Sequence, residues 1–261
     1  NGIGENADNQ LIGIPESIEG LVTLETLVIN NNLITEIPEE ICSLSNLLVL
    51  KLDHNEIREL PAELGGLMNL EILHLNDNNL NSLPSSIGNL DNLEELLLND
   101  NQLNTLPSTF VEMNNLKTIY LHNNQLSNLP ENFNQLENLT TLWLHNNQLL
   151  SLPNNFTDLN MLEILYLHYN DLVTIPEHIG DLSSLRQLKL DNNQLGGQFG
   201  SDSLSVPESI CEFFYNNSEE PNYGKCKLQI FSIDNNLECP IYPDCIDIML
   251  GYQKCSECDS G

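Results

Sequence analysis

The sequence predicts an α/β solenoid, in which short parallel strands line one face and extended or 3₁₀ segments form the other. Three observations predict it. A proline recurs every 23 residues, and a fixed period of roughly 20 to 29 residues is typical of solenoids. Leucine or isoleucine recurs at fixed offsets between the prolines, and an asparagine recurs at one position of each unit. The prolines are Pro15, Pro38, Pro61, Pro84, Pro107, Pro130, Pro153 and Pro176.

Each unit reads L-P-x-x-I/F-x-x-L-x-x-L-x-x-L-x-L-x-x-N-x-L-x-x, as in the segment from Leu83 to Leu103. This pattern resembles the leucine-rich repeat family over roughly residues 9–197, in eight consecutive copies. The resemblance implies a curved horseshoe with a parallel sheet on its concave face. It also implies that the concave face is the binding surface.

The chain is expected to divide into three parts. Residues 1–13 form an incomplete N-terminal turn or a makeshift cap, because residues 1–8 lack the leucines of a strand. Residues 14–197 form the eight repeats. Residues 198–261 combine an insertion with a cysteine-rich cap, and a degenerate last strand is expected near Phe231.

Within each repeat, the L-x-L step predicts a short strand, because side chains alternate and both leucines then face inward. One such strand cannot bury its apolar side alone, but stacked copies form a continuous core. Proline is unsuited to a central strand, so it is expected on the convex return path.

The asparagine of each repeat is expected to turn inward where the chain leaves the strand. There its amide can bond backbone groups of adjacent turns, as buried polar groups require. We assign this column a structural role and no chemistry. Its members are Asn32, Asn55, Asn78, Asn101, Asn124, Asn147, Asn170 and Asn193.

The charge balance excludes several classes of function. The chain carries 38 acidic and 8 basic residues, for a net charge of −30. Nucleic-acid binding requires clustered Lys and Arg, and anionic membrane surfaces would repel the chain. No apolar run approaches the ~20 residues of a membrane span, so membrane insertion is not expected. The charge is read as solubilising, with a basic partner or calcium as the alternative.

Six of the seven cysteines follow residue 210. A solenoid end needs a cap, and disulfides can supply one in an oxidising compartment. Zinc or redox chemistry at Cys255-x-x-Cys258 is the alternative, although its acidic surroundings disfavour a reactive thiol. Cys42 is read as a partly buried apolar residue. The disulfide candidates are Cys211, Cys226, Cys239, Cys245, Cys255 and Cys258, and the sequence does not select their pairing.

The pair Ile210-Cys211 and the later segment from Asn235 to Ile246 together resemble a terminal cap of secreted leucine-rich repeat proteins of marine bacteria. That resemblance implies an extracellular protein. The repeats themselves resemble those of intracellular Ras-scaffold proteins, so a signalling scaffold is the competing hypothesis. Three N-x-S/T sequons, at Asn138, Asn155 and Asn216, are glycosylation sites only in a secreting eukaryote.

Two outward columns change character together in repeats five to seven. The residue between the core leucines becomes aromatic, and the residue two positions on becomes histidine. An ordinary ladder of stacked side chains or a repeat duplication would explain this without function, and a histidine metal site is a weaker reading. We interpret the columns as a ligand-binding patch. Its residues are Tyr120, Trp143, Tyr166, His122, His145, His168 and Tyr169.

The sequence contains no Walker loop, G-x-S-x-G elbow or H-E-x-x-H motif. We therefore expect a binding module without catalysis, cofactor or metal. A protein or peptide ligand is expected first and a glycan second. A structural or adhesive component that assembles with itself is the alternative from another class.

Overall fold

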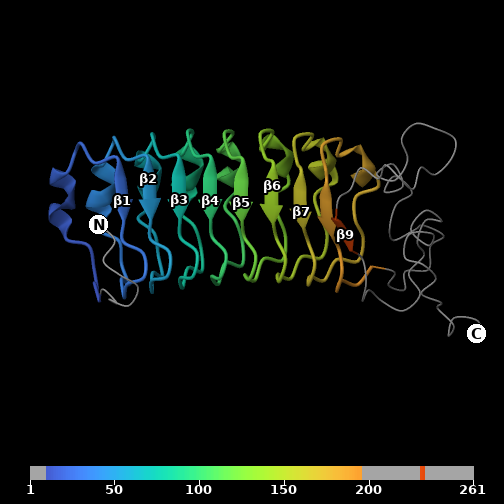
Figure 1. Ribbon diagram of the computed structural model, residues 1–261, viewed down its shortest axis with the longest axis horizontal. Coiled ribbons are helices and arrows are strands. Elements are labelled where there is room, and N and C mark those ends of the chain that lie inside the picture. Colours follow the sequence, from blue (N-terminus) through green and yellow to red (C-terminus); the bar gives the residue numbers. More distant parts are fainter. Residues whose placement is uncertain (1–9, 196–229, 233–261) are drawn as a thin grey trace, which may run out of the picture. The chain divides into compact units, whose positions relative to one another are not determined.

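The computed structural model describes residues 10–195 and 230–232. These belong to two compact units, Asn1–Gln125 (unit 1) and Leu126–Gly261 (unit 2). Each unit is a stack of coils, and each coil within residues 10–195 carries a three-residue strand on one side and a 3₁₀ segment on the other (Figure 1). The predicted leucine-rich repeat solenoid is confirmed in both units.

Within each unit the strands pair in parallel, and the middle residue of one strand lies beside that of the next. In unit 1, Leu27 pairs with Leu50, and Leu50 pairs with Leu73. The strands of unit 1 are β1 (Thr26–Val28), β2 (Val49–Lys51), β3 (Ile72–His74), β4 (Glu95–Leu97) and β5 (Thr118–Tyr120). Those of unit 2 are β6 (Thr141–Trp143), β7 (Ile164–Tyr166), β8 (Gln187–Lys189) and β9 (Ile230–Ser232). β9 pairs with β8, at the place where a degenerate last strand is expected.

The other side of each coil is a 3₁₀ segment, as predicted. Proline directly precedes five of these segments, for example Pro84 with φ −67°. Its ring holds φ near this value, and its missing N–H removes no ladder bond at this place. The segments are η1 (Glu16–Gly20), η2 (Glu39–Ser43), η3 (Leu64–Gly66), η4 (Ser85–Asn89), η5 (Ser108–Glu112), η6 (Phe133–Gln135), η7 (Asn154–Asp158) and η8 (Ile179–Asp181).

The core lies between the strands and the 3₁₀ segments. Both leucines of each L-x-L step from β2 to β8 are fully buried. In β5 an isoleucine, Ile119, replaces the first leucine and is also fully buried. Two phenylalanines contribute to the core of unit 2, where the rings of Phe133 and Phe156 stack with centroids 6.0 Å apart. Burial of this continuous apolar stripe is the main stabilising contribution, because no single coil has a closed core.

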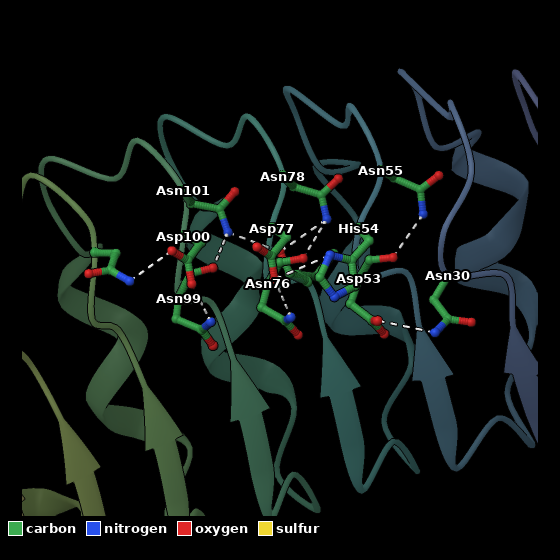
Figure 2. Close-up of polar contacts among 12 residues, drawn as sticks. Asn30, Asp53, His54, Asn55, Asn76, Asp77, Asn78, Asn99, Asp100 and Asn101 are labelled. Atoms are coloured by element: carbon green, nitrogen blue, oxygen red, sulfur yellow. Dashed lines mark hydrogen bonds and ion pairs between the residues drawn. The ribbon is translucent and has the colours of Figure 1, made fainter. Parts of the chain in front are cut away.

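The asparagine column lies inside the turn that follows each strand (Figure 2). Asn101 is representative. Its Nδ2 donates to the carbonyl oxygens of Leu75 at 2.9 Å and Leu98 at 3.1 Å, and its Oδ1 accepts from the Leu80 N–H at 2.9 Å. The same side chain therefore bonds its own coil and the preceding one. Asn55 and Asn78 repeat this pattern.

A second asparagine ladder, which the sequence analysis missed, runs along exposed positions just before the strands of unit 1. The Nδ2 of Asn92 donates to the Met68 carbonyl at 2.7 Å. Asn46, Asn69 and Asn115 bond the preceding coil in the same way, each at 2.7 Å. The signal was present as an asparagine recurring at a second fixed offset.

Cys42 is half-buried, with its thiol free. Burial, and then the carboxylates of Glu63 and Glu39, raise the pKa of this thiol to about 11. It is therefore a thiol and not a nucleophilic thiolate at neutral pH. The six disulfide candidates, Cys211 to Cys258, and the sequon at Asn216 lie outside the described residues. Among the residues that are described, no helix has the length and apolarity to cross a bilayer.

Candidate functional site

The candidate site lies on the outward face of the strands of unit 2, here called the strand face. Trp143, Tyr166 and Lys189 end β6, β7 and β8, and the strand register places each beside the next. Because side chains alternate along a strand, these residues project away from the leucine core. His145 and His168 lie two residues farther on the same face.

Five aromatic rings of unit 2 contact one another, and we call Trp143, His145, Tyr166, His168 and Tyr169 the ring cluster. Trp143 stacks on Tyr166 with centroids 5.3 Å apart and an interplanar angle of 22°. His145 stacks on His168 at 4.3 Å and 8°. The two stacks meet edge to face, with His145 and His168 lying 6.3 and 5.9 Å from Tyr166. Such offset and edge-on pairs are the preferred aromatic arrangements.

Tyr166 is the most constrained member of the ring cluster. Trp143 from β6 lies against its ring, and from β8 the Lys189 Nζ lies 4.4 Å from the ring centroid, a cation–π contact. β6 and β8 flank β7, so the two neighbours occupy opposite faces of the ring. The Tyr166 hydroxyl donates to Gln187 Oε1 at 2.5 Å, and burial raises the pKa of the phenol.

Gln187 and Lys189 were not among the predicted site residues. Both lie in outward columns of the next repeat, which is the signal that would have identified them. Their contacts hold Tyr166 in one orientation before any ligand arrives, which reduces the ordering cost of binding.

His168 is partly withdrawn from water. Its Nδ1 is buried, and it neither donates nor accepts a hydrogen bond within the described residues. Burial lowers the pKa of His168, the carboxylate of Asp191 opposes that effect, and the Lys189 ammonium adds to it. This shift favours the neutral imidazole of His168 over its cation.

Tyr169 stands at a backbone position where a bulky side chain is costly. Its φ is 55°, in the left-handed region. The residues at the same position in the other coils have φ between 53° and 56°, and all are Asn or Asp except His54. Asn and Asp tolerate this conformation, whereas a large ring does not. Tyr169 is 53% exposed, so burial does not offset the strain. Its ring contacts His168 edge to face at 5.5 Å.

Replacing Tyr169 with asparagine is expected to stabilise the protein by roughly 0.5 to 1 kcal/mol, because relief of backbone strain exceeds the loss of one exposed ring contact. The reverse change in another coil, Asn31→Tyr, is the matched control and should destabilise by a similar amount. Urea unfolding of both variants measures the difference. A loss of stability in Tyr169→Asn would show that the ring contributes more to the fold than its backbone costs.

Unit 1 carries the other two predicted site residues. Tyr120 and His122 contact each other with ring centroids 5.9 Å apart, and His122 Nε2 lies 4.0 Å from the Asp100 carboxylate. The other turns that follow the strands of unit 1 carry polar side chains, which form hydrogen bonds with one another (Figure 2). Asn30 donates to Asp53 at 3.2 Å, and Asn123 donates to Asp100 at 2.7 Å.

The geometry does not resemble a metal centre. Within the residues that the structure describes, no three His, Cys, Asp or Glu side chains are grouped to hold an ion. The His145 and His168 rings lie parallel at 8°, face to face, whereas ligands of one tetrahedral metal must converge on it.

The repeats match a known family profile. The profile described as "Leucine rich repeat" matches residues 22–80, 68–126, 91–149 and 137–195. No curated protein matches the sequence.

Several solved structures are similar to this chain. A leucine-rich repeat protein of Leptospira interrogans is 38% identical over 71% of this chain and 47% of its own, with a TM-score of 0.69. The plant peptide hormone receptor RGFR1, in complex with RGF2, is 28% identical over 86% of this chain and 38% of its own, with a TM-score of 0.68. The leucine-rich repeat ectodomain of the Arabidopsis thaliana receptor kinase GASSHO1/SCHENGEN3, in complex with CASPARIAN STRIP INTEGRITY FACTOR 2, is 30% identical over 86% and 28%, with a TM-score of 0.62. This chain spans less than half the length of each.

Proposed function

The chain belongs to the leucine-rich repeat family, and from this premise we propose that it is an interaction module that binds a protein or peptide on the strand face of unit 2. The observation that carries the proposal is the ring cluster. Its rings are held by one another, by Gln187 and by Lys189, and Tyr169 remains exposed at a cost in backbone strain. Rigid aromatic groups with polar tips are enriched at the centres of protein interfaces.

A peptide suits this surface better than a glycan. A sugar packs its C–H groups on an open aromatic face, but both faces of Tyr166 are occupied, by Trp143 and Lys189. Tyr169, which is 53% exposed, instead offers a ring and a hydroxyl that suit the side chains and carbonyls of a polypeptide. One of the similar structures is a plant peptide hormone receptor in complex with RGF2, which agrees with this choice.

We place this function outside the cell. The supporting observations are the similarity to receptor ectodomains and the six cysteines after residue 210. Mass spectrometry of the non-reduced protein, alkylated before digestion, tests the placement. Paired cysteines among Cys211 to Cys258 would support it, and six alkylated thiols in the protein isolated from its natural source would contradict it.

Trp143→Ala is expected to weaken peptide binding at least tenfold, or about 1.4 kcal/mol. Trp143 projects from the core, so a thermal melt should show the fold intact. Leu97→Ala, at the same outward position of β4 in unit 1, is the matched control. The measurement is binding of all three proteins to a random-peptide array and a glycan array. Peptides lost only in Trp143→Ala would support the proposal. A glycan lost instead would overturn the ligand class, and unchanged binding would overturn the site.

A second candidate function is assembly through the first coil. Leu11 and Leu21 occupy core positions yet are 47% and 51% exposed, and Ile12 and Val22 beside them are 77% and 55% exposed. Apolar surface gathered in this way is typical of a protein contact. Light scattering after gel filtration tests this candidate. A dimer that dissociates in Val22→Asp but not in Leu150→Asp, another exposed apolar position, would favour it.

A further inference from the structure

We propose that the stacked His145–His168 pair is an acid-responsive element that disrupts the ring cluster and releases the ligand when it is protonated. This inference rests on the proposed function of the ring cluster and adds its regulation. The pair is the closest ring contact of the cluster, with centroids 4.3 Å apart and planes within 8° of parallel.

The stack is compatible with neutral imidazoles and unfavourable for two cations. Neutral aromatic rings attract at this separation. Two imidazolium rings held face to face would repel, and partial burial weakens the solvent screening that reduces repulsion at an exposed surface. Protonation therefore favours separation of the two rings.

The surroundings of His168 oppose its protonation overall. Within unit 2, the titratable and charged groups around it are His145 from β6, Tyr166 and Tyr169 from its own coil, and Lys189 and Asp191 from the β8 coil. Burial disfavours the cation, Asp191 favours it and Lys189 disfavours it, so that the pKa of His168 is lowered from its ordinary value of 6.5. A proton on the buried Nδ1 would also meet no acceptor within the described residues.

Separation of the His145–His168 stack would also disturb the other rings of the ring cluster. His145 contacts Trp143 at 6.0 Å and Tyr166 at 6.3 Å, whereas His168 contacts Tyr166 at 5.9 Å and Tyr169 at 5.5 Å. The histidines thus touch all three larger rings. A ligand that binds the ordered cluster binds the neutral form better, so by linkage its affinity falls as the histidines take up protons.

The sign of the stability effect follows from the same shift. The pKa of His168 is lower in the folded state than in the unfolded chain, so the unfolded chain takes up the proton first. The contribution to stability is complete above about pH 6.5 and is lost as pH falls below it. Acid should therefore lower stability and affinity together.

The emission of Trp143 tests the element without any ligand, because Trp143 is the only tryptophan in the chain. The probe is its fluorescence between about pH 8 and about pH 5, the range in which histidine titrates. We expect the wild-type emission to change with a midpoint below pH 6.5, and the change to be lost in His168→Gln and His145→Gln. His178→Gln is the control, since His178 is exposed beside η8 and pairs with Asp181 at 3.8 Å. It should leave the wild-type curve unchanged.

Proton NMR of the histidine rings in the wild type provides a measurement that needs no variant. Coupled titration of His145 and His168 below pH 6.5 supports the proposal, and independent titration at the ordinary value overturns it. Array peptides that bind at neutral pH should bind at least tenfold weaker near pH 5 in the wild type and less so in His168→Gln. Peptides whose affinity is flat or rises on acidification would overturn the inference and leave the binding function standing. Absence of any peptide would overturn the function, while the fluorescence and NMR results still decide the acid response.

Discussion

Replacing Asn101 with alanine is expected to lower the free energy of unfolding by about 3 kcal/mol, because three buried backbone groups each lose a partner. The N–H group is left with none, at about 1 to 3 kcal/mol, whereas each of the two carbonyls keeps a second asparagine donor, Asn78 or Asn124. These groups are the Leu80 N–H and the carbonyls of Leu75 and Leu98. No water reaches them, because Asn101 and the leucines beside it are buried. Alanine also leaves a void where the amide was, which adds a smaller cost.

Asn92→Ala is the matched control for this experiment. Asn92 belongs to the exposed ladder and makes one bond to the preceding coil, at 2.7 Å to the Met68 carbonyl. Water can replace that bond, so the expected cost is about 0.5 to 1 kcal/mol. Urea unfolding followed by circular dichroism measures both variants. Equal losses in the two variants would mean that the buried position of the Asn101 amide adds nothing to its contribution to the free energy of unfolding.

Gly88→Ala is expected to destabilise unit 1 by about 3 kcal/mol, because an added methyl group overpacks a contact between backbones. A Cβ at Gly88 would lie 2.3 Å from the Thr109 carbonyl oxygen and 2.8 Å from the Thr109 Cβ. Gly88 is in η4 and Thr109 in η5 of the next coil, so the two coils would have to separate. Shortening the side chain of Thr109 cannot relieve the clash, since the nearest atom belongs to the backbone.

Gly20→Ala provides the comparison. Gly20 ends η1, and a Cβ there would meet nothing within 4 Å. The expected change is within about 0.5 kcal/mol, as for other open surface positions. The melting temperatures of the two variants, measured beside the wild type, distinguish the effect of the steric clash from the effect of glycine's backbone preference. A large loss in both would mean that glycine is required for its conformation and not for the space it leaves.

The sequence was sufficient to predict the coil. The L-x-L step correctly indicated the strand and the direction of each side chain, as the buried Leu50 and Leu52 and the outward Lys51 show. The outward columns also identified Trp143 and Tyr166 as neighbours, because consecutive parallel strands with one repeat length keep one register. The same reading also grouped Tyr120 and His122 with them. Those residues belong to unit 1, and their grouping with the ring cluster stays a prediction.

Several features of the site and of the packing between coils could not be predicted from the pattern. The left-handed turn under Tyr169 is a backbone angle, and the column of Asn and Asp hinted at it only indirectly. The contacts of Gln187 and Lys189 with Tyr166 depend on which rotamer each long side chain adopts. The exclusion of a methyl group at Gly88 depends on a distance of a few ångströms between two coils.

By itself, the sequence determined the repeating coil, its leucine core, its inward asparagines and which side chains project outward from the strands. These follow from periodicity, which is a property of order along the chain. Only the tertiary structure decided how the rings of Trp143, His145, Tyr166 and His168 stack and which of their faces stay open. The physical reason is that stacking, burial and the resulting pKa of His168 depend on short distances between atoms of different coils. A pattern of residue types does not contain those distances.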